Sequence, residues 1–531
     1  MNLRPYQQKA KEDIRSAFSQ VKKHIILQAP TGSGKTVIFS SIAKDIAAKN
    51  NKVLILTNRA ELLLQAGGSI KKVGLQSFYI QAGSKYVSNS FNSYIAMSQT
   101  LRRRVTENYW IEFLKTIDLF IIDEAHIQEF NWLFVLDFMK DKYVIGFTAT
   151  PRRSGKMRQL GLDYEHLITS VTVKELIDMG YLVNDDYYGC DAPDMTGVEI
   201  DRMKGDYKEN QMFKKFNSPQ LYAGVVDNWR RITPDTKTLV FCVNIQHCIE
   251  TCLEFQKNGI DARFIVSDVS QPKLKNNPTD GEKVAYDERM KVFELYQQFR
   301  NLYSGDREQI FDDFASGVFP VLINAGIATT GYDCPTIETV ILNRATTSTT
   351  LLLQMIGRGS RIADNKTHFN ILDFGGNCSR LGYYTENRIW GLWHDEFNGE
   401  GLPPVKTCGI DSKGKPITDK KGCNRMILAA YKICPFCGFL YPDKQIESID
   451  LQSIYFDIIQ KKAVKTKRIK DMTNTEISDY YKAKGHKPAW LWRQLWYKDG
   501  EKGIENFGTE FNWNKTTIQK AKDFCKNLER R

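Results

Sequence analysis

Two sets of short apolar runs constrain the fold of this chain more than any other feature of its sequence. Each run ends in small or polar residues: the first set is HIILQAP, KVLILTN, SYIAMSQ, DLFIIDEAH and YVIGFTAT, and the second, from Thr238 to Phe374, is TLVFCVN, ARFIVSD, FPVLINA, ETVILNR and HFNILDF. Continuous apolar runs separated by helical stretches are typical of parallel strands buried on both faces. The sequence therefore predicts an α/β fold of two lobes, each built on a parallel sheet, with ligand sites at the carboxyl ends of the strands.

The pattern between and after these sets predicts the domain boundaries. Residues 184–218 are polar and irregular, which is typical of a connector, and residues 270–303 are charged and interrupt the second set as a surface insertion. A chain of 531 residues also has room for smaller domains. We expect lobe 1 over 1–183, the connector over 184–218, lobe 2 over 219–378, a small zinc-binding element over 379–449 and a basic, mainly helical module over 450–531.

Charge and composition exclude some classes of protein. With 42% apolar and 26% charged residues the chain is a folded protein, and it has neither an apolar N-terminal region nor an apolar run near the ~18 residues that span a bilayer. We therefore expect a cytoplasmic protein without a membrane partner. The net charge is +12, and residues 461–531 hold 18 Lys and Arg against 9 Asp and Glu, which favours a polyanionic partner for the basic module.

A phosphate-binding loop is predicted directly after the first apolar run. Ala29 to Thr36 reads APTGSGKT, between HIILQ and a helical segment. Gly32, Ser33 and Gly34 allow successive backbone N–H groups to converge on phosphate oxygens, and the following helix points its positive end at them. Lys35 would reach the β and γ phosphates, and the Thr36 hydroxyl would bind Mg²⁺. The alternative is a glycine-rich turn without function.

Two adjacent carboxylates end another predicted strand. Asp123 and Glu124 follow DLFII, and paired carboxylates at the buried end of a strand are costly unless a cation or a reacting water uses them. Asp123 is suited to holding Mg²⁺, and Glu124 is suited to orienting or deprotonating an attacking water. The alternative is a surface pair of carboxylates.

Six motifs together resemble the superfamily 2 helicases over residues 1–378. They are RPYQ at Arg4 to Gln7, APTGSGKT, DEAH at Asp123 to His126, TATP at Thr148 to Pro151, NAGIATTGYDCP at Asn324 to Pro335, and QMIGRGSR at Gln354 to Arg361. More narrowly, the chain resembles the RadD-type branch, which is related to the motor subunits of restriction enzymes and carries cysteine-rich elements after the core. The resemblance implies two RecA-like lobes with ATP bound between them.

The resemblance also implies roles for single residues. Arg4 and Gln7 would recognise adenine, and Gly331 and Asp333 would lie at the ribose. Arg358 and Arg361 would reach the γ phosphate as arginine fingers, since planar guanidinium groups suit the charge of a transferring phosphoryl group, and Gln354 would join them. Thr148 and Thr150, with His126, would link hydrolysis to lobe movement. Taken alone, each of these residues could instead be an ordinary surface or capping residue.

A nucleic-acid track is expected on polar segments that follow other strands. Hydroxyls and backbone N–H groups in such loops can hold phosphates without reading bases, although ordinary turns have the same composition. The segments are Thr57-Asn58-Arg59, Ser98-Gln99-Thr100, Asn244 and Asn324-Ala325-Gly326.

Four of the eleven cysteines predict a zinc site. Cys434 and Cys437 form a C-x-x-C-G turn that can place two thiolates on one Zn²⁺, and Cys408 and Cys423 would complete a tetrahedral set. The spacing of Cys408 and Cys423 is irregular for such a site. A redox or incidental thiol pair is the alternative.

The last segment interleaves basic and aromatic residues. It reads KKAVKTKRIK from Lys461 and then YKAKGHKPAWLWRQLWYK from Tyr481, with Trp490, Trp492, Trp496 and Tyr497. Such a surface can neutralise phosphates and stack on bases. Because Trp492 and Trp496 share one helical face, they could instead pack the core of a small domain.

These features predict an ATP-dependent DNA helicase or translocase of repair, recombination or replication, with ATP, Mg²⁺ and Zn²⁺ as cofactors. Single-stranded or junction-containing DNA is favoured over RNA because the order of modules resembles RadD. An RNA helicase is the alternative enzyme, and a nucleotide-gated scaffold with little turnover is the alternative outside catalysis. The oligomeric state stays open.

Overall fold

The computed structural model divides the chain into two units. One unit comprises Met1–Gly399 with Ile454–Ile459, and the other comprises Glu400–Ser453 with Gln460–Arg531. The structure describes residues 3–58, 60–127, 139–153, 159–189, 193–201, 203–274, 278–329, 332–393, 405–407, 426–428, 437–440, 457–458, 473–475, 477–478, 481 and 488–529. Within these ranges no helix has the length and apolar character needed to cross a membrane.

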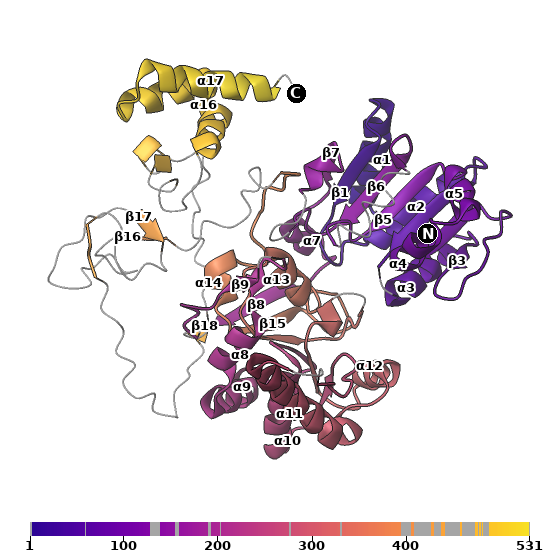
Figure 1. Cartoon of the computed structure of the whole chain (residues 1–531), viewed down its shortest axis with the longest axis vertical. Helices are drawn as coiled ribbons and strands as arrows, with labels where there is room; N and C mark the ends of the chain where they lie inside the picture. Colours follow the sequence, from indigo (N-terminus) through magenta and orange to yellow (C-terminus); the bar gives the residue numbers. More distant parts are fainter. Residues whose placement is uncertain are drawn as a thin grey trace. The chain divides into compact units, whose positions relative to one another are not determined.

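Lobe 1 is a seven-stranded parallel sheet flanked by helices (Figure 1). Its strands occur in the order β3-β4-β2-β5-β6-β1-β7. The strands are β1 (His24–Gln28), β2 (Val53–Thr57), β3 (Phe78–Ile80), β4 (Ser93–Met97), β5 (Leu119–Asp123), β6 (Tyr143–Thr148) and β7 (His166–Thr169). The helices are α1 (Pro5–Ser19), α2 (Lys35–Ala47), α3 (Ala60–Lys72), α4 (Ser98–Arg104), α5 (Asn108–Lys115), the short 3-10 helix η1 (Leu160–Leu162) and α7 (Val173–Asp178).

Lobe 2 repeats this design with one antiparallel strand at the border. The sheet order is β12-β13-β11-β14-β15-β8-β18, in which only β18 runs antiparallel among the described strands. Its strands are β8 (Asn184–Gly189), β11 (Thr238–Cys242), β12 (Ala262–Ile265), β13 (Val321–Asn324), β14 (Thr339–Asn343), β15 (His368–Asp373) and β18 (Asp457–Ile458). Its helices are α8 (Glu209–Phe216), α9 (Pro219–Ile232), α10 (Ile245–Lys257), α11 (Asp280–Tyr303), α12 (Arg307–Ser316), η2 (Ile327–Thr329), α13 (Thr349–Ile356) and α14 (Asn377–Leu381).

The apolar runs form the cores of both lobes, as the sequence predicts. All five residues of β2, β5, β11 and β14 are buried, because helices pack on both faces of each sheet. All ten predicted strands are present. The cores of lobe 1 and lobe 2 each form two clusters, one on either face of the sheet.

The predicted connector is wrong in part. Asn184–Gly189 is strand β8, which pairs in parallel with β15 and so belongs to the second sheet. After it come a two-stranded hairpin, β9 (Ile200–Asp201) and β10 (Asp206–Tyr207), and helix α8. The structured part of lobe 2 therefore begins at residue 184 and not at residue 219.

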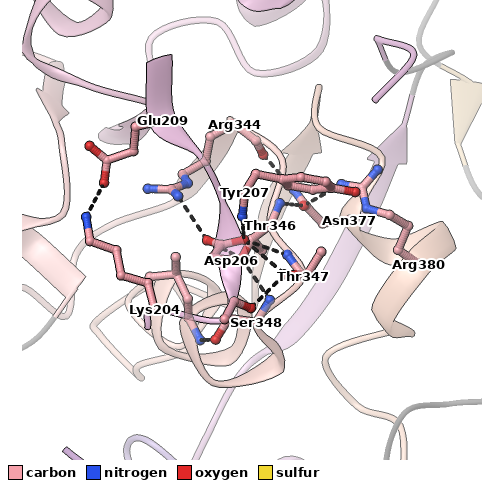
Figure 2. Close-up of polar contacts among 12 residues, drawn as sticks. Lys204, Asp206, Tyr207, Glu209, Arg344, Thr346, Thr347, Ser348, Asn377 and Arg380 are labelled. Atoms are coloured by element: carbon pink, nitrogen blue, oxygen red, sulfur yellow. Dashed lines mark hydrogen bonds and ion pairs between the residues drawn. The ribbon is translucent and has the colours of Figure 1, made fainter. Parts of the chain in front are cut away.

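An ion pair fixes this hairpin to lobe 2. Figure 2 shows Arg344, Thr346 and Thr347 converging on the carboxylate of Asp206. Arg344 Nη2 lies 3.2 Å from Asp206 Oδ2, Thr346 Oγ1 donates to the same oxygen at 2.9 Å, and the Thr347 backbone N–H donates to Oδ1 at 2.8 Å. Because Asp206 is buried and receives several hydrogen bonds, it holds the hairpin against the loop that follows β14.

The larger part of the predicted insertion is one long helix. Residues 280–303 form α11, whose capping box joins Thr279 and Glu282. No residue of α11 is fully buried, but Leu295, Tyr296 and Phe299 pack partly against the core beside β12. The prediction of a charged surface insertion with a helical pattern is confirmed.

The second unit contains a small helical core. Helices α16 (Pro488–Glu510) and α17 (Lys515–Glu529) pack together, and α16 is kinked at Asp499 and Gly500. Strands β16 (Val405–Thr407) and β17 (Met426–Leu428) form an antiparallel ribbon. The predicted boundary at residue 379 is wrong, because residues 379–393 contact the lobes of the first unit, and β18 also pairs there.

Candidate active site

The motifs of lobe 1 come together at the carboxyl edge of three neighbouring strands. The sheet order places β5, β6 and β1 side by side. The loop Ala29–Thr36 follows β1, Asp123 ends β5, and Thr148 ends β6. Because the carboxyl ends of parallel strands share one edge, these segments form a single site.

The loop from Ala29 to Thr36 has the backbone shape that the sequence predicts. Gly32 and Gly34 adopt φ values of +85° and +78°, which glycine tolerates best. A Cβ at Gly34 would lie 2.6 Å from Gln7 Nε2, so a side chain there would displace the Gln7 amide from its present position. Helix α2 begins at Lys35, so its first N–H groups face this loop.

The N-terminal segment packs directly on this loop. Gln7 Nε2 donates to the Ser33 carbonyl at 3.0 Å, and the Tyr6 hydroxyl donates to the same oxygen at 2.6 Å. The Arg4 guanidinium lies 3.9 Å from the ring centroid of Tyr181. Gln7 therefore packs on the loop and Arg4 on Tyr181; their role in recognising adenine stays a prediction. Sequence reasoning missed Tyr6 and Tyr181; the position of Tyr6 beside Gln7 was the only available signal.

Asp123 and Glu124 form an acidic pair in which Asp123 is buried and Glu124 is partly buried. Glu124 has φ +49°, an uncommon conformation for a residue other than glycine. Burial and the Glu124 carboxylate raise the pKa of Asp123 to about 7, and the Lys35 ammonium opposes this rise. Glu124 Oε2 is buried and makes no hydrogen bond within the residues that the structure describes. An acidic pair with unused oxygen lone pairs, at the same sheet edge as the phosphate loop, fits a hard cation such as Mg²⁺.

His126 connects Glu124, Thr148 and lobe 2. The Thr148 hydroxyl donates to the Thr150 carbonyl at 3.1 Å, so it accepts from His126 Nδ1, which lies 2.7 Å away. His126 Nδ1 is also 3.4 Å from Glu124 Oε2. Burial lowers the pKa of His126 to about 4, so the ring is neutral at pH 7 and its Nε2 can accept from Gln354 Nε2 at 3.5 Å. The predicted grouping of His126 with Thr148 is present.

The two arginines of lobe 2 differ in their surroundings. Arg361 Nη1 pairs with Asp333 Oδ1 at 2.6 Å, and the Arg361 side chain packs against Gly32. Arg358 is buried, and its guanidinium donates to the carbonyls of Thr329 and Tyr332. Arg361 is therefore the arginine that lies against the loop of lobe 1 in this structure. Their role as arginine fingers stays a prediction, as does the ribose site, since Gly331 lies outside the described residues.

Two side chains of the expected nucleic-acid track, those of Asn244 and Asn324, are used within the fold. Asn244 Oδ1 caps α10 by accepting from the His247 N–H at 2.9 Å. Asn324 is fully buried, donates to the Val240 carbonyl and accepts from the Ala328 N–H. Ser98 and Thr57 are also buried. These contacts favour the structural alternative for Asn244 and Asn324; Arg59 lies outside the described residues.

The C-terminal predictions are tested only in part. Trp492 and Trp496 pack partly buried against the core of the second unit, and the Trp492 and Phe524 rings meet edge to face at 5.7 Å. This contact favours core packing for these two tryptophans. Of the zinc cysteines the structure describes Cys437, which is exposed, whereas Cys408, Cys423 and Cys434 lie outside the described residues. The zinc site therefore stays a prediction.

Comparisons with known proteins agree with this arrangement. Residues 1–153 match the family described as "Type III restriction enzyme, res subunit", and residues 224–363 match the "Helicase conserved C-terminal domain". IRC3 of Saccharomyces cerevisiae, provisionally named as an ATP-dependent helicase, is 30% identical over 421 residues, which span 74% of this chain and 54% of IRC3. The chain belongs to the superfamily 2 helicases.

Within this superfamily the chain is related to the motor subunits of restriction enzymes. The EcoAI endonuclease subunit of a type I restriction enzyme from Escherichia coli is 24% identical over 402 residues, which span 70% of this chain and 46% of that subunit. A solved fragment provisionally assigned as the HsdR subunit of a type I restriction enzyme from Vibrio vulnificus has the same fold, with a TM-score of 0.51, 21% identity, and coverage of 70% of this chain and 64% of the fragment. The chain spans about half the length of IRC3 and of the EcoAI subunit.

Proposed function

We propose that this protein is an ATP-driven DNA translocase or helicase. The observation that supports this most is the meeting of two lobes at one site. Lys35, Glu124 and His126 come from the carboxyl edge of the first sheet, whereas Arg361 and Gln354 reach the same edge from lobe 2. A site divided between two lobes is suited to converting phosphate chemistry into lobe movement.

Different residues would carry out different parts of ATP hydrolysis. The loop N–H groups and Lys35 would hold the phosphates, and Glu124 would orient and deprotonate the attacking water. Thr36 and Asp123 would hold Mg²⁺, which when bound supplies positive charge to the phosphate oxygens. Arg361, which pairs with Asp333 here, would bring its guanidinium to the transferring phosphoryl group.

His126 would carry the state of the site to lobe 2. It touches Glu124 and Thr148 on its own lobe and Gln354 on the other, and it is neutral at pH 7. A neutral ring that donates on one side and accepts on the other can change partners without moving charge. We infer that, when the lobes open, His126 loses its contact with Gln354 and thereby alters its contact with Glu124.

DNA is the proposed polymer for two reasons. The chain is similar in sequence to restriction-enzyme subunits, and the order of its modules resembles that of the RadD-type branch. ATP turnover of the whole chain with matched single-stranded DNA, duplex DNA and RNA tests this. We expect the largest stimulation with DNA, and no stimulated turnover in Glu124→Gln, which should still bind ATP. Larger stimulation by RNA would favour the RNA helicase. ATP and DNA binding without turnover in the native chain would favour the nucleotide-gated scaffold.

A Zn²⁺ ion in the second unit is part of the proposal. Thr407 of β16 pairs with Met426 of β17 at one end of the ribbon. Thr407 directly precedes Cys408, and Met426 comes shortly after Cys423, so both cysteines are close in sequence to that end. Gly438, directly after Cys437, has φ +72°, the conformation that lets a C-x-x-C-G turn close. Elemental analysis should give one zinc per chain, and full zinc retention after Cys434→Ser with Cys437→Ser would contradict the site.

The basic module is proposed to add affinity for nucleic acid. Because β18 pairs with β8, the deletion that tests this should begin at Gln460 and leave Asp457–Ile458 in place. Deleting Gln460–Arg531 should weaken DNA binding and flatten its dependence on salt, since fewer phosphates are neutralised. Unchanged affinity and salt slope would assign the module to protein contacts or to plain packing.

A further inference from the structure

A segment after the last helix of lobe 2 returns to lobe 1. We call residues 382–393, which follow α14, the strap. Residues 384–390 of the strap are fixed to lobe 2: the Tyr384 hydroxyl donates to Ser360 Oγ at 3.0 Å, and Tyr384 is buried. Arg388 Nη2 donates to the carbonyls of Leu381 and Tyr383 at 3.1 and 2.9 Å, and Trp390 packs against the core of lobe 2.

The end of the strap is fixed to lobe 1. The Gly161 N–H in η1 donates to the Leu392 carbonyl at 3.0 Å, and Leu392 packs against the core of lobe 1. Trp393 lies directly on Gly161, where a Cβ would come within 2.3 Å of Trp393 Cε2. Glycine at position 161 thus leaves the space that the indole ring fills.

The strap lies against segments of the candidate active site. Arg388 and Trp390 line a cavity together with Pro30 and Thr31 of the phosphate loop, and Leu392 lines another with Pro151. Ser360, which receives the Tyr384 hydrogen bond, directly precedes Arg361. The strap therefore joins the loop that carries Arg361 to the lobe that carries Lys35.

We propose that Leu392 and Trp393 are positioning residues that tether lobe 1 to lobe 2. The tether keeps Arg361 close to the phosphate loop when the lobes open, and so favours their return to the closed state. This inference rests on the proposed ATP-driven function. A tether raises the effective concentration of one lobe near the other, and a lower population of the closed state weakens apparent nucleotide affinity in proportion. The strap touches no reacting atom, so it changes the closed population and not the chemical step.

Docking of the strap can be measured without any activity. In Gly161→Ala the new methyl group displaces Trp393, so hydrogen exchange should become faster in peptides that cover Leu160–Tyr164 and Arg388–Trp393. Gly68→Ala is the matched control, because Gly68 is exposed in α3 and a Cβ there meets nothing within 4 Å. Unchanged protection in Gly161→Ala would overturn the proposed docking.

Positioning is measured by nucleotide affinity and by steady-state kinetics. In Gly161→Ala the dissociation constant of a non-hydrolysable ATP analogue and the KM for ATP should rise about tenfold, while kcat at saturating ATP and DNA stays within about twofold. Trp393→Ala should behave alike, and the double variant should be no worse than Trp393→Ala, because removing the ring also removes the clash. Faster exchange with unchanged affinity would overturn positioning. Absence of ATP turnover in the native chain would contradict the proposed function alone, since the analogue titration still reports on the strap.

Discussion

The carboxyl edges of the two sheets have the same topology but use their polar side chains differently. At the edge of the first sheet, Glu124 Oε2 is buried without a hydrogen bond inside the described residues. At the edge of the second sheet, the side chains of Asn244 and Asn324 form hydrogen bonds with backbone groups of lobe 2. A buried polar atom without a hydrogen bond costs about 1–3 kcal/mol, whereas a capping asparagine stabilises its own helix. The comparison indicates that Glu124 is available to a ligand, whereas Asn244 and Asn324 serve the stability of lobe 2.

Removing a charge from the first edge should have the largest effect. Lys35→Ala should lower DNA-stimulated ATP turnover by on the order of 100-fold or more, because a positioned cation is lost from the phosphates. Lys44→Ala is the matched control, since Lys44 is exposed on the same helix α2. Steady-state ATPase assays measure both. Near-normal turnover of Lys35→Ala would remove the distinction between the two edges.

Acid should destabilise lobe 2 through its buried histidine. Burial, reinforced by the Arg344 guanidinium, lowers the pKa of His247 to about 3. Below the ordinary pKa of about 6.5 the unfolded chain binds a proton that the folded chain does not, so stability falls as the pH drops from 6.5 toward 3, by up to a few kcal/mol. Chemical unfolding of the native chain and of His247→Gln across this range measures the effect. An equal loss in both would assign the acid sensitivity to other groups.

Asn324→Ala should reduce stability more than activity. It leaves the Val240 carbonyl and the Ala328 N–H without their partner in a fully buried place, which costs about 1–3 kcal/mol. Denaturant unfolding measures this loss. Turnover per folded molecule at saturating DNA should stay close to that of the native chain. A large drop in DNA affinity with unchanged stability would return Asn324 to the nucleic-acid track.

Asn244→Ala should have the smallest effect, because it removes one helix cap. Loss of such a cap costs about 1 kcal/mol. Asn244→Asp retains a capping oxygen and should recover most of the stability in the same unfolding experiment. If the Asp variant instead bound DNA much more weakly at full stability, Asn244 would contact the polymer.

The sequence predicts those parts of the molecule that depend on local pattern. The apolar runs locate ten strands, and the motifs locate Lys35, Asp123 and His126 because the end of a strand is a local property. Strand β8 was missed because its residues, NDDYYG, are largely polar: β8 lies next to the border strand β18, and one face of β8 is exposed. Such a strand has the composition of a loop.

Contacts between distant residues could not be predicted. The pairing of Asp206 with Arg344 joins positions 138 residues apart, and nothing in either local sequence indicates the partner. The same holds for Tyr181 beneath Arg4 and for Trp393 on Gly161. A single glycine without a turn pattern gives no sign that a distant indole ring needs its space. Three-dimensional packing, and not residue type, decides these contacts.

The pairing of β8 with β15 also sets the order in which the two lobes can form during synthesis. The first sheet is complete once Thr169 has been made, because all of its strands lie before that residue. The second sheet joins residues 184–189 to residues 368–373, so β8 has no neighbour until about 180 more residues have left the ribosome. At typical rates of translation this takes roughly 10–40 s. During that interval a folded lobe 1 would precede a lobe 2 whose first strand is still unpaired.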